Sequence, residues 1–432
     1  MGTLTTDVEA PAPPDDTPDD GAAPTSASPR RRFRRVLFGQ RKAGYQVHKW
    51  LSLVLMAWIV LESVTGAALV FAPEIDRWWN SEAHRVTDGD VGMDAAIDAA
   101  RDARPGEPVD SAWAPGGLGP TYSIVTVDDG GVFRLVLVDP GSGRVTTADH
   151  EEPALTRMME RLHFKLNSTE ILGFASTTIV GWLALAWLVI LVTGFTVWYW
   201  PRIKRWARAL RVRHGRGRLI FNVDLHNAIG IATILPLTLI VLTGVAFMFP
   251  NQVRETYEVA TFGLYEEPDT TAALSTPNGG EPITAGEATE RVVALDDGID
   301  VQLVETPSGS PVGVYRVHTV VDGSYLELVG GARDVEFEVD QYSGRIVRIS
   351  DPADGNGATR AYADWTYPVH IGTFGGTITR WLWVAIGLSP LALAWTGVVM
   401  WWVRHRNRRR GALDDTAPEP SVQSDEKTLE QV

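Results

Sequence analysis

Four long apolar stretches divide the chain, and a polar segment separates each stretch from the next. A helix that crosses a bilayer needs ~20 mostly apolar residues, and each stretch reaches that length. The pattern therefore predicts a membrane protein with an all-α four-helix bundle. The apolar stretches are Leu51–Phe71, Ile179–Trp200, Ile229–Phe249 and Trp381–Trp402.

The first long polar segment has the periodicity of a small α+β domain. Met93–Arg104 reads as a helix, and the residues of Tyr122–Val127 and Val132–Val138 alternate on either side of an Asp-Asp-Gly-Gly turn. A short strand is expected at Arg144–Thr147. Between these elements, Ala114–Gly119 is a Gly- and Pro-rich insertion at a place where a further strand would be expected.

The second long polar segment repeats this plan. Thr284 and Glu287 form a capping box for a helix that runs to Leu295. Antiparallel strands are expected after it, so each polar segment is predicted to be a helix-plus-sheet domain. The expected strands lie near Val301–Glu305, Val312–Thr319, Val335–Val339 and Arg345–Ile349.

The distribution of charge predicts the orientation in the membrane. Arg30–Lys49 and Pro201–Ile220 each hold eight basic residues and no acidic one, and a further basic run begins at Arg404. The long segments are acidic, with nine basic against 18 acidic residues over 73–170 and seven against 21 over 250–379. Short Lys/Arg-rich loops stay cytoplasmic. We therefore expect a multi-pass protein of the cytoplasmic membrane with both termini inside, no nucleic-acid partner, and both α+β domains outside.

These features give the predicted domain boundaries. Membrane helices are expected at 44–72, 175–200, 221–250 and 377–403, with outer domains at 73–174 and 251–376, a cytoplasmic loop at 201–220, a disordered basic N-terminus at 1–43 and a cytoplasmic tail at 404–432.

A Thr-Gly pair lies late in every apolar stretch. In the first and third stretches, the threonine follows His48 or His226 by 17 residues. In the second and fourth, a tryptophan follows the threonine by five residues. Because both halves begin on the same side, the pattern predicts an internal parallel duplication. The pairs are Thr65-Gly66, Thr193-Gly194, Thr243-Gly244 and Thr396-Gly397.

Four of the nine histidines lie at or near the start of the four stretches. His48 and His226 occupy equivalent positions at the cytoplasmic ends, and His163 and His370 occupy equivalent positions at the outer ends. Imidazole is the usual protein ligand of haem iron. The arrangement predicts two bis-histidine sites, one for each pair, whereas the alternative is that the histidines only extend their polar tips to the membrane surface.

His163 is the least regular of the four, because it lies 16 residues before Ile179. A continuous helix would place it ~24 Å from that residue, so ligation requires the chain to bend between Asn167 and Gly173. The remaining histidines lie in polar segments and are predicted to be solvated surface residues. They are His84, His150, His214, His318 and His405.

Glu62 is the one clear carboxylate within an apolar stretch. Ionisable residues inside membrane segments are functional candidates by default. Glu62 is therefore a candidate catalytic group, as a proton relay beside a haem, or a hydrogen-bonding group between helices, and both interpretations stay open.

The composition narrows the redox chemistry. The chain has no cysteine, which excludes thiolate-held iron–sulfur clusters, disulfides and covalent c-type haem. Any haem must therefore be bound without a covalent link, as haem b is, and the two histidine pairs predict two haems per chain. No glycine-rich dinucleotide motif follows a strand, so a separate electron donor, a quinol or a reductase, is expected.

Several motifs together resemble the PepSY-associated transmembrane proteins, which are often called iron-regulated membrane proteins. These motifs are the His-Lys-Trp-Leu-Ser start at His48, the four Thr-Gly pairs, and the related turns ending at Gly143 and Gly344. The resemblance covers about residues 44 to 405, and the insertion at Ala114–Gly119 departs from the pattern. It implies four spans, two outward PepSY domains, b-type haem and, for some members, reduction of ferric siderophores outside the membrane.

The sequence thus predicts a haem-dependent transmembrane electron-transfer protein that reduces an outer acceptor, a ferric chelate such as siderophore iron. Two alternatives remain. The first is a regulatory or binding membrane protein with PepSY domains and no redox activity. The second is an iron–siderophore permease, which the single intramembrane carboxylate and the lack of a clear broken helix disfavour.

Overall fold

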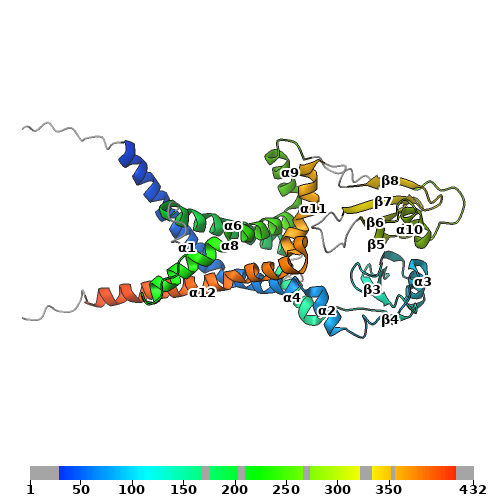
Figure 1. Cartoon of the computed structure of the whole chain (residues 1–432), viewed down its shortest axis with the longest axis horizontal. Coiled ribbons are helices and arrows are strands. Elements are labelled where there is room, and N and C mark those ends of the chain that lie inside the picture. Colours follow the sequence, from blue (N-terminus) through cyan, green and yellow to red (C-terminus); the bar gives the residue numbers. More distant parts are fainter. Residues whose placement is uncertain are drawn as a thin grey trace, which may run out of the picture.

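The structure is a computed structural model that describes residues 29–167, 175–202, 210–265, 273–321, 333–351 and 356–414. A bundle of long helices forms one end of the molecule, and a β-sheet with two short helices forms the other (Figure 1). The first and last helices extend away from the bundle at the end opposite the sheet. Of the predicted tails at 1–43 and 404–432, residues 1–28 and 415–432 lie outside the described residues.

The bundle consists of α1 (Pro29–Leu69), α6 (Ala175–Arg202), α8 (Arg218–Met248) and α12 (Gly376–Asp414). Each contains a segment long and apolar enough to cross a membrane, which confirms the four predicted spans. The helices are longer than predicted at both ends of the chain. Residues 29–43, expected to be disordered, continue α1, and 404–414 continue α12, because the arginines there are good helix formers.

The four helices pack in a ring. α1 contacts α6 and α12, and α8 contacts the same two helices, so α1 and α8 face each other across the ring. Apolar side chains line the interior of the ring. On its outside, the exposed fractions of Val54, Leu235 and Trp395 are 75%, 69% and 71%. Large exposed apolar side chains on a helix that is long enough to span a bilayer are suited to contact lipid.

Four shorter helices lie where the bundle meets the sheet domain, and sequence reasoning identified none of them. α2 and α9 follow the first and third long helices, and α4 and α11 precede the second and fourth. Their bounds are Ala72–Trp79, Pro250–Ala260, Ala154–Lys165 and Gly357–Ile371, and a 3-10 turn, η3 (Thr373–Gly375), joins α11 to α12.

The two long polar segments form one antiparallel sheet of eight strands in the order β4-β3-β2-β1-β5-β6-β7-β8. This corrects the expectation of two independent sheets, because β1 pairs with β5 and joins the two halves edge to edge. The strands are β1 (Val109–Trp113), β2 (Tyr122–Val127), β3 (Phe133–Val138), β4 (Val145–Thr147), β5 (Ile299–Glu305), β6 (Val314–Val321), β7 (Arg333–Asp340) and β8 (Ile346–Ser350).

A row of apolar residues crosses this sheet in register and explains why the halves join. The partners run Val136, Ile124, Ala112, Val304 and Val317, and each is fully buried. Because direct cross-strand partners share a face, the row presents one continuous apolar surface across the boundary between the halves.

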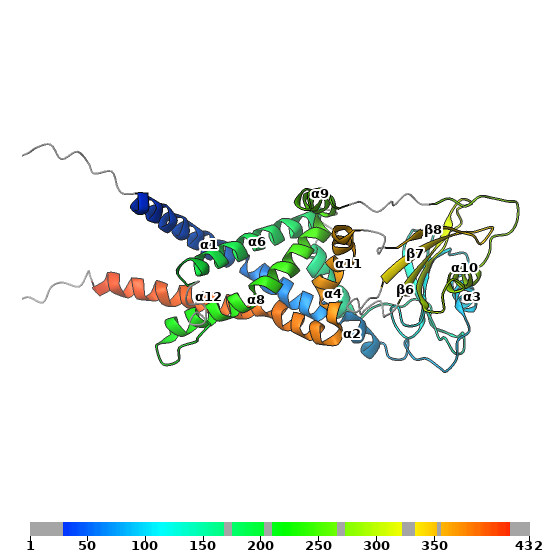
Figure 2. The same cartoon turned by 45° about the horizontal axis from the view of Figure 1, so that its top comes forward.

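Helices α3 (Met93–Ala103) and α10 (Ala285–Val293) cover that surface, one from each half (Figure 2). The predicted capping box of α10 is present, since Thr284 Oγ1 accepts from the backbone N–H of Glu287 at 3.1 Å and the Glu287 carboxylate accepts from the backbone N–H of Thr284 at 2.9 Å. Asp94 of α3 accepts from Thr284 Oγ1 at 2.6 Å and from Gly286 N at 2.7 Å, so the two helices are also joined directly.

Candidate functional site

Each of the four Thr-Gly pairs faces a histidine that comes from a different helix. Thr65-Gly66 faces His163, Thr193-Gly194 faces His48, Thr243-Gly244 faces His370, and Thr396 faces His226. Sequence reasoning had identified these pairs as markers of the repeat but not as partners of the histidines.

The glycines permit a close approach of three of the imidazole rings. A Cβ added at Gly66 would lie 2.8 Å from Cε1 of His163, and one added at Gly194 would lie 2.9 Å from Cε1 of His48. At Gly244 the corresponding distance to His370 is 3.2 Å. A side chain at the first two positions would therefore displace the ring, which is the physical reason for glycine there.

His48 and His226 lie together toward the end of the bundle opposite the sheet, where α1 begins and α12 ends (Figure 1). Their ring centroids are 6.3 Å apart and the ring planes are nearly perpendicular, at 83°. His48 Nδ1 donates to the carbonyl oxygen of Ile190 at 2.9 Å. His226 Nδ1 donates to Thr396 Oγ1 at 2.9 Å, because that hydroxyl uses its own hydrogen on the carbonyl oxygen of Ala392.

His163 and His370 form the second pair, at the end of the bundle near the sheet. Their ring centroids are 6.4 Å apart, with an angle of 58° between the planes. His370 Nδ1 donates to the carbonyl oxygen of Ile240 and lies within 3.0 Å of both that oxygen and Thr243 Oγ1. His163 Nδ1 lies 3.1 Å from Thr65 Oγ1.

The break that returns His163 to the bundle lies directly after it. α4 ends at Lys165, and the next two residues, Leu166 and Asn167, adopt left-handed backbone conformations with φ of 50° and 51°. α4 packs against α1 as well as α6. The chain therefore turns at the start of the predicted region, and the rest of that region, 168–174, lies outside the described residues.

Glu62 adds a carboxylate to the second pair. Its Oε2 lies 2.9 Å from His163 Nδ1, and the residue is only 7% exposed. Its other oxygen, Oε1, is buried without a hydrogen-bond partner within the described residues. A carboxylate that accepts from Nδ1 fixes the orientation of the ring and increases the basicity of its other nitrogen. Among the four histidines, His163 is the one with an ion-pair contact of this kind in the described residues.

The two pairs fit the geometry of bis-histidine haem ligation. In all four rings Nδ1 has an acceptor, so Nδ1 carries the hydrogen and Nε2 keeps the lone pair that binds a metal. A metal ~2.0 Å from each of two nitrogens, with each nitrogen ~1.1 Å from its ring centre, places the ring centroids ~6.2 Å apart. The observed separations are 6.3 and 6.4 Å. The structure thus brings together the predicted partners, and ligation itself stays a prediction.

The remaining histidines divide into two groups. His214 and His405 are exposed, as predicted. His84 and His150 are not solvated, and this prediction was wrong: their side chains are 9% and 4% exposed and both contact Asp76. His318 is partly buried beside Glu305, with 20% of its side chain exposed. Burial of these three follows from the packing of the sheet domain, which sequence polarity alone does not reveal.

Comparison with known protein families gives a match to most of the chain. A family model described as the PepSY-associated TM region matches residues 45–404, which is most of the chain and includes all four histidines of the two pairs. Among curated proteins, the comparison found no match.

Proposed function

The chain belongs to the PepSY-associated TM family, and from this premise we propose that it is a b-type haem protein that transfers electrons across the membrane to an extracytoplasmic acceptor. His48 and His226 would hold one haem, and His163 and His370 would hold the other. Each haem, when bound, supplies a site that accepts and releases single electrons. The observation that carries the proposal is the pair of neighbouring imidazoles at each end of the bundle, with ring centroids 6.3 Å and 6.4 Å apart, which would hold one haem each.

The protein contributes orientation and electrostatics to these sites. The acceptors on Nδ1 hold each ring in one tautomer, with Nε2 available as ligand. The glycines allow the rings to lie close to the helix backbone. Glu62 distinguishes the two sites, because its negative charge lies beside His163 and not beside His48 or His226.

We infer the orientation from the charges that flank the spans. In the sequence, basic residues cluster at the start of α1, between α6 and α8, and after the apolar part of α12, whereas the two long segments that contain the strands are acidic. By the positive-inside rule the termini are cytoplasmic and the sheet domain is outside. The His48–His226 pair is then on the inner side and the His163–His370 pair on the outer side of a cytoplasmic membrane.

The matching order of elements in the two halves supports an internal parallel duplication. Each half runs long helix, short helix, sheet helix, four strands, histidine-bearing helix and long helix. Equivalent histidines from the two halves then meet at each end of the bundle. A site built from both copies would explain why neither half carries a complete pair of facing ligands.

For the acceptor we propose ferric iron in a siderophore, as the family resemblance implies. The electron donor is a separate quinol or reductase. The histidine pairs favour this function over a PepSY regulatory protein without redox activity and over an iron–siderophore permease, since neither alternative requires facing imidazoles at two levels.

Purified full-length protein tests the haem proposal. We expect an oxidised-minus-reduced spectrum of b-type haem and two haems per chain. His48→Ala and His226→Ala should each remove the same haem, and His163→Ala and His370→Ala the other, while the exposed control His214→Ala keeps both. Protein without haem would support the regulatory alternative. If His48→Ala and His163→Ala removed one common haem, the pairing between halves would be wrong.

Two further measurements test orientation and acceptor. In intact cells, tags at either terminus should be protected from external protease, whereas a tag at Gly279-Gly280 should be cut. In vesicles with reductant inside and a ferric siderophore outside, a ferrous-specific chelator should detect Fe²⁺ only when both haems are present. Haem-loaded protein that never yields Fe²⁺ would contradict the proposed acceptor but not electron transfer.

A further inference from the structure

A second cluster of metal-ligating residues lies outside the bundle. Asp76, His84 and His150 each direct one ligand atom to a common point, and these three atoms lie within 4.8 Å of one another. Asp76 lies in α2, His84 in the segment that follows α2, and His150 in the segment between β4 and α4. The fold therefore assembles this cluster from residues up to 74 positions apart.

The contacts within the cluster converge on a single oxygen. Nε2 of His84 and Nε2 of His150 lie 2.8 Å and 2.9 Å from the same atom, Oδ2 of Asp76. The two imidazole rings meet edge to face, with centroids 5.2 Å apart. Two neighbouring ligands of an octahedral ion with bonds of ~2.1 Å lie ~3.0 Å apart. The two nitrogen–oxygen distances are close to that separation.

We propose that Asp76, His84 and His150 form a binding site for a divalent first-row transition-metal ion. Two imidazoles and one carboxylate are a ligand set that such ions prefer, and they leave further coordination positions for water or an exchangeable ligand. The ion would be bound by the same three atoms. Each neutral imidazole would then carry its one N–H hydrogen on Nδ1 in place of Nε2, so that Nε2 offers its lone pair to the ion and no proton is lost. The proposal is independent of the function of the histidine pairs in the bundle.

The three side chains are buried, which a surface ion pair would not require. Their exposed fractions are 13% for Asp76, 9% for His84 and 4% for His150. Nδ1 of His84 is also buried and has no hydrogen-bond partner within the described residues. The hydrogen bonds among the three residues therefore leave one buried nitrogen atom unsatisfied.

Groups around the cluster hold its ligands in place. Asn80 Nδ2 donates to Asp76 Oδ1 at 2.7 Å and to the carbonyl oxygen of Glu151 at 3.1 Å. This leaves Oδ2 for the histidines and joins the Asp76 helix to the His150 segment. Outer-shell hydrogen bonds of this kind orient the ligands in metal sites.

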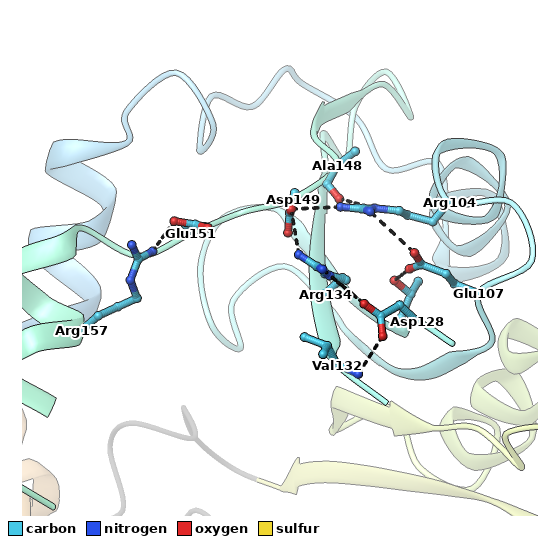
Figure 3. A network of polar contacts seen from close by, with 10 residues as sticks. Arg104, Glu107, Asp128, Val132, Arg134, Ala148, Asp149, Glu151 and Arg157 are labelled. Carbon is cyan, nitrogen blue, oxygen red and sulfur yellow. Dashed lines mark hydrogen bonds and ion pairs between the residues drawn. The ribbon is translucent and has the colours of Figure 1, made fainter. Parts of the chain in front are cut away.

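The segment that carries His150 is fixed on both sides by arginines (Figure 3). Arg104 Nε donates to the carbonyl oxygen of Ala148 at 2.8 Å, and Arg134 forms an ion pair with Asp149 at 3.2 Å. On the other side, Arg157 of α4 forms an ion pair with Glu151 at 2.6 Å. His150 is therefore preorganised by contacts that do not involve the other two ligands.

The second half of the chain does not repeat this cluster. Counting from Pro73 in α2 and Pro250 in α9, the positions of Asp76 and His84 are occupied by Val253 and Thr261. The cluster is thus an addition to the repeated plan, and its position ties α2 to the segment leading into α4, the helix that carries His163.

Metal binding to the full haem-containing chain tests the proposal. After treatment with a chelator, the protein is titrated with Zn²⁺, and separately with Co²⁺, by calorimetry. We expect one tight site per chain and, at the zinc X-ray absorption edge, a first shell with imidazole ligands at ~2.0 Å. The zinc edge is separate from the haem iron, so the readout does not depend on redox activity.

Substitutions then locate the site. His84→Ala, His150→Ala and Asp76→Asn should each weaken Zn²⁺ binding at least tenfold, since loss of even an outer-shell group costs about 10–100-fold. Two control variants should leave binding unchanged. His318→Ala removes another partly buried histidine beside a carboxylate, and His214→Ala removes an exposed histidine. Haem content and far-ultraviolet circular dichroism test whether each variant is folded. If an alanine variant does not fold, Asp76→Asn still tests the site, because it keeps the shape of the side chain. Wild-type protein that binds no Zn²⁺ or Co²⁺ at millimolar concentration, or folded variants that bind it as wild type does, would overturn the proposal.

Discussion

The glycine of a Thr-Gly pair decides how closely the facing histidine approaches its helix, and the four pairs differ in this respect. At Gly194 an added Cβ would lie 2.9 Å from the ring of His48, whereas at Gly397 nothing lies within 4 Å. The two positions are equivalent in the proposed repeat, so they provide a matched test of the steric role.

We predict that Gly194→Ala removes the haem of the His48–His226 pair and that Gly397→Ala does not. Alanine favours helix over glycine by about 1 kcal/mol, so weakening of α6 cannot explain a loss. Haem per chain should fall from two to one in the first variant and stay at two in the second. If both variants kept two haems, the close approach of His48 to α6 would not be needed for ligation.

The contact between Glu62 and His163 indicates an electrostatic role that sequence reasoning did not identify. A single substitution distinguishes this role from a hydrogen bond between helices. The carboxylate lies 2.9 Å from His163 Nδ1, where its charge makes the imidazole a stronger donor to a metal. We predict that Glu62→Gln raises the midpoint potential of the haem at the His163–His370 pair by about 60 mV, the equivalent of tenfold in a one-electron equilibrium. The other potential should not change.

A redox titration of both haems measures this shift. Ser63→Ala, which alters a buried neighbour of Glu62, should leave both potentials unchanged. Glutamine can still hydrogen-bond to a neighbouring helix, so potentials equal to those of wild type in Glu62→Gln would favour a packing role for Glu62.

At the scale of elements, the long helices and most strands could be predicted because their apolar periodicity is strong. β2 has the predicted bounds, and α3 and the strands of the second half differ from prediction by a few residues. β1 was missed because Val109–Trp113 is short and includes the polar Asp110 and Ser111. It becomes a strand through pairing with β2 and β5 on either side, and that information is not local.

The short helices α2 and α9 were missed for a related reason. Each is amphipathic and begins with a proline near its first turn, and a few turns of helix beside a long apolar span have no distinct pattern. The cluster of Asp76, His84 and His150 was missed with them, since polar residues in polar segments read as solvated until the fold brings them together. The four bundle histidines could be predicted because each has a fixed position relative to an apolar stretch.

Strand β5 carries a pH-sensitive contact. Nε2 of His318 lies 3.6 Å from Oε1 of Glu305. This contact is the largest influence on the pKa of Glu305. Together with Arg316 it outweighs the opposing effect of burial and lowers that pKa from its usual 4.5 to about 2. A lowered pKa in the folded state stabilises the fold above the unfolded pKa. That contribution is lost as the pH falls from about 4.5 to 2.

We therefore predict that the sheet domain unfolds more readily at pH 3 than at pH 6, and that Glu305→Gln reduces this difference. Thermal unfolding followed by circular dichroism at the two pH values measures it. Glu82→Gln is the control, because that carboxylate is exposed in a surface ion pair with Arg85, and such pairs contribute little. An equal pH effect in wild type and Glu305→Gln would show that other carboxylates dominate.

At the scale of the whole molecule, the two outer segments form one body and not two. Residues almost 200 positions apart pair directly, as Ser111 does with Glu305, and Asp94 holds the N-terminus of the helix from the other half. Neither long segment reveals this partner, because an edge strand has the same sequence pattern whether or not another strand pairs with it. The joined sheet also attaches the four spans, at one end of the bundle, to a single domain (Figure 1).

The absence of cysteine from the chain allows a direct test of the joined sheet. Directly opposed residues of antiparallel strands have Cα atoms ~4.5–5.5 Å apart, within the range that a disulfide spans. We predict that Ser111→Cys with Glu305→Cys forms a disulfide under mild oxidation. After cleavage at a protease site inserted at Gly279-Gly280, the two fragments should stay together on a non-reducing gel and separate on a reducing one. Ser111→Cys with Glu336→Cys is the control, because its two positions are three strands apart, ~14 Å, and should not crosslink. Equal crosslinking of both pairs, or of neither, would mean that the halves do not pair through β1 and β5, and that each outer segment folds and moves on its own.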